Sequence, residues 1–68
     1  MGAKEKIRRA ARRKKETYAS ISVKLGMPLQ SYANRLSRGK MSFDYAEKVA
    51  DALGCDIVFL DRETGEIF

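Results

Sequence analysis

The chain has 68 residues, of which 44% are hydrophobic and 34% charged, with one cysteine, no histidine and a net charge of +5. This length allows one domain with a single small core. One cysteine excludes an intramolecular disulfide, and without histidine there are too few ligands for a zinc cluster, so we expect no metal and no cofactor.

The first predicted helix covers residues 3–15. Ile7, Ala10 and Ala11 recur at helical spacing and give it one thin apolar stripe, whereas its other faces are almost wholly basic. Alanine and arginine favour helix, but so narrow a stripe needs packing against other elements to be stable.

A second helix is predicted over residues 18–25. Thr17 is its expected N-cap, because a threonine hydroxyl can accept a hydrogen bond from an unpaired backbone N–H of the first turn. Gly26 and Pro28 end this helix, since glycine suits a left-handed C-cap and proline disfavours helical dihedrals at the preceding residue. A tight break of three or four residues follows.

Two more helices are predicted over residues 29–38 and 43–53. Gly39 ends the first of them, and Ser42 can cap the second. The last helix has the clearest apolar stripe of the chain, formed by Phe43, Ala46, Val49, Ala50 and Leu53.

Residues 56–68 change to the pattern of a short β-strand or hairpin, with Gly65 in the loop. The apolar run in this segment is far too short to span a membrane, and the N-terminus lacks the apolar segment of a secretory signal, so we expect a cytoplasmic protein. Both faces of the strand are apolar, and one face needs cover from a second subunit. The expected homodimer interface is Ile57, Val58, Phe59 and Leu60.

Charge is unevenly distributed along the chain. Residues 1–24 contain nine Lys and Arg against two Glu, and residues 25–40 add three basic residues and no acid. Residues 41–68 carry two basic residues against seven acids. This asymmetry predicts one face that binds a polyanion, although an uneven solvated surface is the alternative.

Two short helices joined by a tight turn, the second with exposed amides and guanidiniums, predict a helix-turn-helix that places its second helix in the major groove of double-stranded DNA. Amide side chains can bond adenine bidentately and arginine can bond guanine. The candidate base-reading residues are Gln30, Ser31, Asn34 and Arg38. The candidate phosphate-contacting residues are Thr17, Tyr18, Arg35, Ser37 and Lys40.

The run from Thr17 to Met27, continuing through Pro28 to Lys40, resembles the helix-turn-helix of the Cro/lambda-repressor-like family, also called the xenobiotic-response-element (XRE) type of bacterial regulators. Residues 43–55 are similar to the helix that follows the recognition helix in that family, and residues 56–67 to tails of its small phage and mobile-element members.

The resemblance implies a mainly α, compact four-helix domain spanning residues 1–68, with a short C-terminal strand or hairpin. It also implies a homodimeric transcriptional regulator of a prokaryote or phage that binds a palindromic operator at the nucleoid. Repression is the expected mode, and in Cro-like members a C-terminal strand makes the dimer.

The match to the family pattern is clear at the turn and departs from it elsewhere. Gly26 matches the turn glycine, and Ser22 stands where the family usually has alanine. Tyr18 and Leu29 occupy positions where glutamine is frequent, and Tyr32 is larger than the usual Ile or Val. Leu29 is expected either to pack in the core or to touch a thymine methyl group, which leaves the operator sequence open.

Other classes of function are less well supported. An enzyme is not expected, because the chain has no histidine, no serine–base arrangement, no phosphate-binding glycine loop and little volume for a pocket; for the last reason no small-molecule ligand is expected. One alternative is a protein-interaction module of the antitoxin or anti-repressor type, and another is RNA binding through the basic N-terminus. A membrane-surface helix is not favoured, since residues 3–15 lack bulky apolar side chains.

Overall fold

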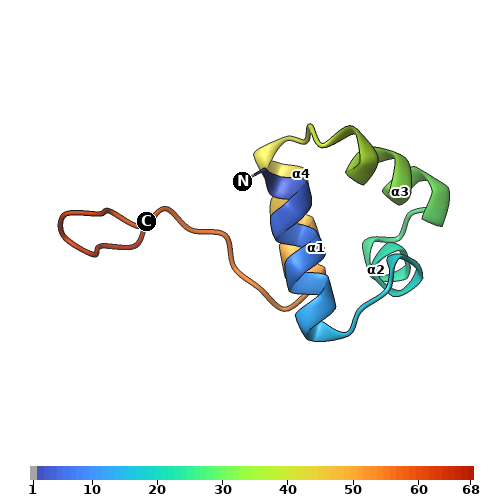
Figure 1. Cartoon of the computed structure of the whole chain (residues 1–68), viewed down its shortest axis with the longest axis horizontal. Helices are drawn as coiled ribbons and strands as arrows, with labels where there is room; N and C mark the ends of the chain where they lie inside the picture. The colour runs from blue at the N-terminus through green and yellow to red at the C-terminus, as the bar shows by residue number, and fades with distance from the viewer. Residues whose placement is uncertain (1) are drawn as a thin grey trace.

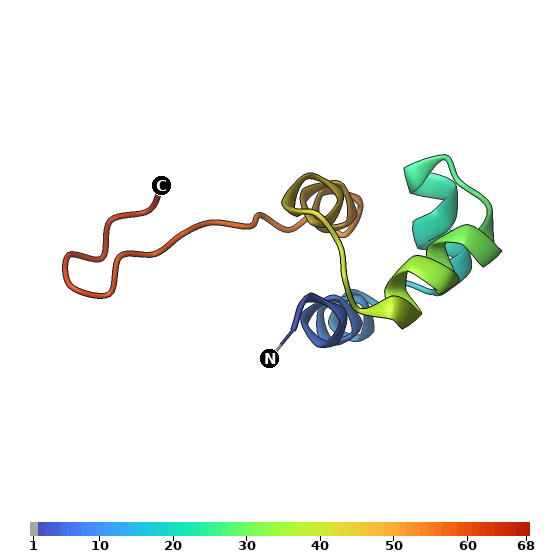
Figure 2. The ribbon, with the colours of Figure 1, turned by 90° about the horizontal axis from the view of Figure 1, so that it is seen from above.

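A computed structural model describes residues 2–68 as a small all-α domain of four helices (Figure 1). The helices are α1 (Ala3–Lys14), α2 (Tyr18–Leu25), α3 (Leu29–Arg38) and α4 (Phe43–Ala52). Helices α1 and α4 lie side by side, and Figure 2 shows both nearly end-on. Helix α2 packs against both α3 and α4.

Local sequence explains where α2 begins and ends. The Thr17 hydroxyl accepts a hydrogen bond from the Ser20 backbone N–H at 3.1 Å, while the Ser20 hydroxyl accepts from the Thr17 N–H at 2.9 Å. These reciprocal bonds form a capping box, which satisfies two backbone donors at the start of the helix. At the other end, Gly26 adopts a left-handed φ of 69°.

The other helix ends also follow local chemistry, with two small differences from the prediction. Ser42 caps α4 by accepting from the Tyr45 N–H at 3.1 Å. Helix α1 ends at Lys14 rather than residue 15, because Lys15 adopts a left-handed φ of 56°. Helix α4 ends at Ala52, with Leu53 as its C-cap.

The core lies where the four helices meet. It contains side chains from every helix, together with the Leu53 that follows α4: Ile7, Ala11, Ile21, Tyr32, Leu36, Val49 and Leu53. Phe43, part of the apolar stripe predicted for the last helix, is 46% exposed. Leu29, expected either in the core or against a thymine methyl group, is 47% exposed and so does not pack in the core. Each stands in the first turn of its helix, at the edge of the packed region.

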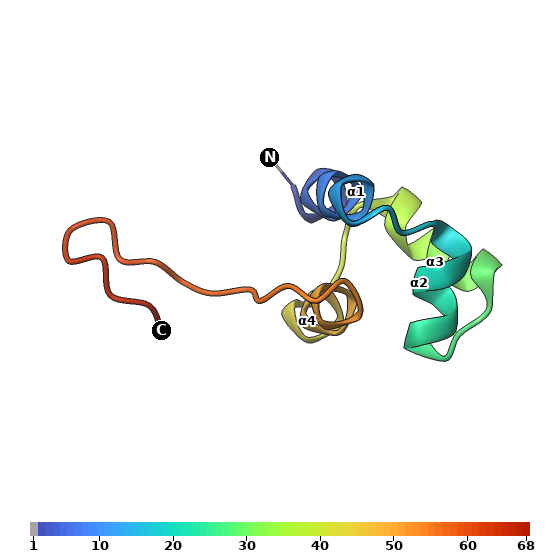
Figure 3. The same cartoon turned by 90° about the horizontal axis from the view of Figure 1, so that it is seen from below.

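Residues 55–68, here called the arm, extend away from the helices (Figures 2 and 3). The expected strand does not form within residues 2–68: a single antiparallel bridge joins Leu60 to Ile67. It is supported by hydrogen bonds from the Asp61 N–H to the Glu66 carbonyl and from the Phe68 N–H to the Phe59 carbonyl. A two-stranded hairpin without a third strand or helix against it is at best marginally stable, which accounts for the difference.

No helix within residues 2–68 combines the length and the apolar character needed to cross a lipid bilayer.

Candidate nucleic-acid interface

Burial of one face of α3 fixes which of its residues meet solvent. Tyr32 and Leu36 are each 1% exposed and hold α3 against the core, where Ile21 of α2 is fully buried. The turn between α2 and α3 is closed by hydrogen bonds from the Gly26 N–H to the Val23 carbonyl and from the Met27 N–H to the Ser22 carbonyl. These bonds tie the start of the turn to the end of α2.

The opposite face of α3 carries the predicted base-reading amides. Gln30, Ser31 and Asn34 are all exposed. The Gln30 Nε2 donates to the Asn34 Oδ1 at 3.1 Å, so the two side chains, one helical turn apart, form a pair. This pair keeps an amide oxygen on Gln30 and an NH₂ group on Asn34 for further hydrogen bonds.

A basic hollow lies between the C-terminal end of α3 and the start of α4. Its volume is about 240 Å³, and its lining contains no acidic residue. Three basic side chains line it together with Met41, Ser42 and Tyr45: they are Arg35, Arg38 and Lys40. Guanidinium and ammonium side chains that line one hollow suit the oxygens of a phosphate.

Tyr45 positions one of these guanidiniums. The Arg35 Cζ lies 4.7 Å from the centroid of the Tyr45 ring, which is a cation–π contact. The Tyr45 hydroxyl donates to the Met27 sulfur at 3.4 Å, so the ring is tied to the turn between α2 and α3. Burial raises the pKa of the Tyr45 hydroxyl, and the Arg35 charge opposes that rise.

Thr17 and Tyr18, predicted to contact phosphate, have structural contacts at the start of α2. Thr17 belongs to the capping box, and the Tyr18 ring packs edge-on against Tyr32 with centroids 5.6 Å apart. The Ser20 hydroxyl donates to the Glu16 carboxylate at 2.7 Å, and Lys24 forms an ion pair with Glu16 at 2.8 Å. The Lys24 and Ser20 hydrogen bonds lower the pKa of Glu16.

Helix α1 reaches the interface through a residue that the sequence did not single out. The Lys4 ammonium lies 3.5 Å from the Ser37 carbonyl oxygen, and the Ser37 side chain itself is exposed. Lys4 therefore adds a positive charge beside the end of α3. Its place depends on how α1 packs, and the only signal in the sequence is that α1 is basic. Tyr45 and Ser42, which also line the basic hollow, are likewise not indicated by the sequence pattern.

Acidic side chains gather at a different place on α4. A second hollow, of about 580 Å³, is lined by Lys48, Cys55, Ile57 and four acids, Asp44, Glu47, Asp51 and Asp56. None of the residues lining the basic hollow lines this one. The charge asymmetry along the sequence is thus also a separation in space.

The predicted dimer residues are remote from α3. The arm leaves the helices on the side away from α2 and α3, along the 41 Å longest axis of the molecule (Figure 1). Ile57 is 36% exposed, while Phe59 and Leu60 are more than 60% exposed. The exposed face of α3 and the arm can therefore be occupied at the same time.

Comparison with known proteins adds no relative: no family model, no curated protein and no solved structure matches this chain.

Proposed function

We propose that this chain is a sequence-specific double-stranded DNA-binding transcriptional regulator of the helix-turn-helix type, acting as a repressor. The observation that carries the proposal is the exposed Gln30–Asn34 pair on α3 beside a hollow lined by Arg35, Arg38 and Lys40. Groups suited to base edges and groups suited to phosphates thus lie next to each other on α3 and directly after it.

In this mechanism α3 enters the major groove. The free amide groups of Gln30 and Asn34 bind base edges, adenine being the base that offers a matching donor and acceptor. Leu29, exposed in the first turn of α3, meets a thymine methyl group. Each good pair discriminates against the wrong base by about 1–3 kcal/mol.

The basic hollow holds the DNA backbone. Arg35 and Lys40 contact phosphate oxygens there, and Arg38, predicted from sequence as a base-reading residue, acts with them because it lines the same hollow. Such contacts fix the register of α3 on the duplex without reading its sequence. Two copies of the chain place their α3 helices about 34 Å apart on a pseudo-palindromic site.

The test is selection of binding sites from a pool of random 25-base-pair duplexes, followed by titration of the selected duplex. Wild-type protein should enrich one short pseudo-palindrome. Asn34→Ala and Gln30→Ala should each relax preference at single base pairs, at a cost of about 1–3 kcal/mol for the preferred site. Glu47→Gln, on the exposed outer side of α4, is the matched control and should leave the preference unchanged.

The same experiment separates the alternatives. A protein-interaction module of the antitoxin or anti-repressor type would enrich no duplex. An RNA-binding protein would be competed by single-stranded RNA better than by the selected duplex. Equal weakening of all duplexes by Gln30→Ala would contradict the base-reading role of that residue.

A further inference from the structure

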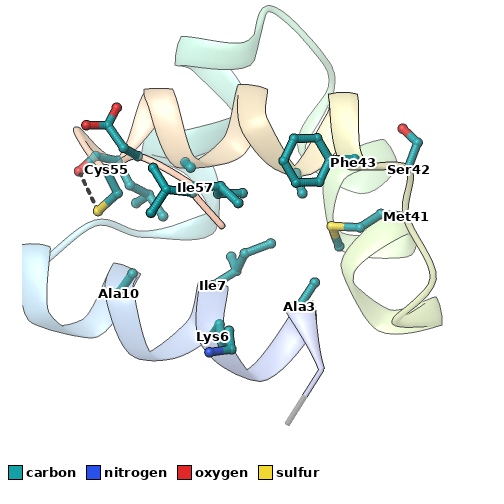
Figure 4. Close-up of a pocket in the computed structure, with 14 residues that line it drawn as sticks. Ala3, Lys6, Ile7, Ala10, Met41, Ser42, Phe43, Cys55 and Ile57 are labelled. Atoms are coloured by element: carbon teal, nitrogen blue, oxygen red, sulfur yellow. Dashed lines mark hydrogen bonds between the residues drawn. The ribbon is translucent and has the colours of Figure 1, made fainter. Parts of the chain in front are cut away.

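A groove with apolar walls runs between α1 and α4. It has a volume of about 660 Å³, and Figure 4 shows Ala3, Ile7 and Ala10 of α1 pointing across it toward α4. Four of the lining residues are alanines, namely Ala3, Ala10, Ala46 and Ala50. Because these side chains are short, the two helices leave room for larger side chains from another segment.

The chain's own arm covers only part of this groove. Ile57 and Val58 line it, and the Phe59 ring stacks on Phe43 with centroids 5.8 Å apart and planes inclined by 12°. The rest of the arm extends away from the helices and loops back at its outer end (Figures 2 and 3). The expected dimer residues are therefore divided between those that face the groove of their own chain and those that do not.

The outer part of the arm, from Phe59 to Phe68, carries large apolar side chains that are mostly exposed. Phe59, Leu60, Ile67 and Phe68 are 68%, 61%, 63% and 70% exposed. The bridge between Leu60 and Ile67 holds this part of the arm as one unit. An exposed cluster of this kind marks an interaction surface in a small protein.

Charge indicates what the outer arm binds. Asp61, Glu63 and Glu66 make it acidic, with Arg62 as its one basic residue. One wall of the groove is α1, which has seven basic residues and one acid, while the charged residues that line the groove itself are Lys6 and Asp56. The acidic outer arm is thus complementary in charge to α1, and its apolar side chains match the largely apolar lining of the groove.

We propose that the α1–α4 groove of one copy seats the outer arm of a second copy, and that the exchange is reciprocal about a two-fold axis. Such an isologous contact closes at two chains, because each copy contributes one arm and one groove. An aromatic side chain can bury about 150–250 Å². The interface would comprise the two arms, each with two phenylalanines, a leucine and an isoleucine, and the groove walls that they cover. Its buried area can reach about 1,200–2,000 Å², which is typical of a stable interface.

This inference deepens the homodimer of the proposed function by naming where the arm binds. It differs from pairing of one arm with the other, which would leave the groove open. The two arrangements make opposite predictions for substitutions in the groove. Such substitutions should weaken a dimer formed by arm exchange, but not one formed by pairing of the two arms, because no groove residue takes part in that pairing.

The first test is sedimentation of full-length protein without DNA. The wild-type chain should be a dimer, and Ala10→Trp, which fills the groove from α1, should weaken the dimer at least tenfold. Ala19→Trp makes the same substitution at an exposed position of α2 that does not line the groove, and should have no effect. Circular dichroism checks that both variants keep their helices. A wild-type monomer at millimolar concentration, or a dimer insensitive to Ala10→Trp, would overturn the proposal.

The second test is disulfide trapping in a Cys55→Ser background. Chains with Lys6→Cys in the groove are mixed with chains carrying Ile67→Cys in the arm and oxidised gently. The mixed dimer should form faster than either homodimer. If Ile67→Cys homodimers form first, or no cross-linked dimer forms, the arm does not bind in the groove.

Failure of this inference is distinguishable from failure of the proposed function. Monomeric Ala10→Trp protein should still bind a duplex that contains a single half-site, since no interface residue of α3 is changed. Intact half-site binding without a groove-dependent dimer would overturn the arm exchange alone.

Discussion

The Tyr32 hydroxyl is buried in the core without a hydrogen-bond partner among residues 2–68. An unsatisfied buried hydroxyl costs stability, because water no longer bonds it and no protein group replaces the water. Burial also raises the pKa of Tyr32 to about 12. The phenol is therefore held in its neutral form well above the pH at which an exposed tyrosine ionises.

We predict that Tyr32→Phe stabilises the fold by about 1 kcal/mol at neutral pH. The gain should grow above pH 10: the unfolded tyrosine ionises near pH 10 and the folded one near 12, so stability is lost as the pH rises through that interval. Urea unfolding between pH 7 and 12 measures both effects. Tyr45→Phe is the control at neutral pH, since its hydroxyl has the Met27 partner, and it should bring no gain there. A destabilised Tyr32→Phe protein would show that the hydroxyl has a partner in solution.

At the scale of elements, helix α2 depends on its capping box. Thr17→Ala removes the acceptor for the Ser20 N–H and should lower the free energy of unfolding by about 1 kcal/mol. Thr17→Ser keeps the hydroxyl, so the free energy of unfolding should fall much less. Urea denaturation of the three proteins makes the comparison. Equal losses for alanine and serine would mean that the methyl group of Thr17, and not its cap, is what matters.

Helix ends in this chain were predictable where a single residue determines them. Gly26 and Gly39 end α2 and α3 in left-handed conformations, with φ of 69° and 72°, as their positions in the sequence indicate. The left-handed Lys15 was not predictable, because lysine has no preference for that conformation. Its N–H bonds the Ala11 and Arg12 carbonyls, a geometry that arises from the chain's path into α2.

The strand expected at Ile57–Leu60 shows a second reason why local sequence does not determine the fold. β-Branched and aromatic residues favour an extended chain, but a strand also requires a paired neighbour. Within residues 2–68 that neighbour is reduced to one bridge. The Arg35–Tyr45 contact could not be predicted either, because it depends on how α4 packs against the other helices. No local spacing in the sequence indicates it.

At the scale of the whole molecule, the separation of basic and acidic surfaces predicts which charged side chains contribute to DNA binding. Lys40→Ala should weaken all duplexes alike and reduce the slope of log affinity against log salt concentration by about 0.9, the effect of one phosphate contact. Lys48→Ala removes the same charge from the acidic hollow and should leave the slope unchanged. Fluorescence anisotropy between 50 and 300 mM salt gives the slopes. Equal slopes for Lys40→Ala and wild type would place the phosphates outside the basic hollow.

The placement of α3 and the arm at opposite ends of the long axis has a consequence for how such a protein can change over time. Under the two proposals, the residues that choose a DNA target lie before residue 46, whereas those that choose a partner chain lie both in the arm and in the α1–α4 groove, most of whose lining precedes residue 54. A genetic crossover between α4 and the arm would therefore join the groove of one parent to the arm of the other. Such a protein would keep its DNA target but lose a matched pairing surface, so arm and groove must change together before new regulators can coexist in one cell without forming mixed dimers.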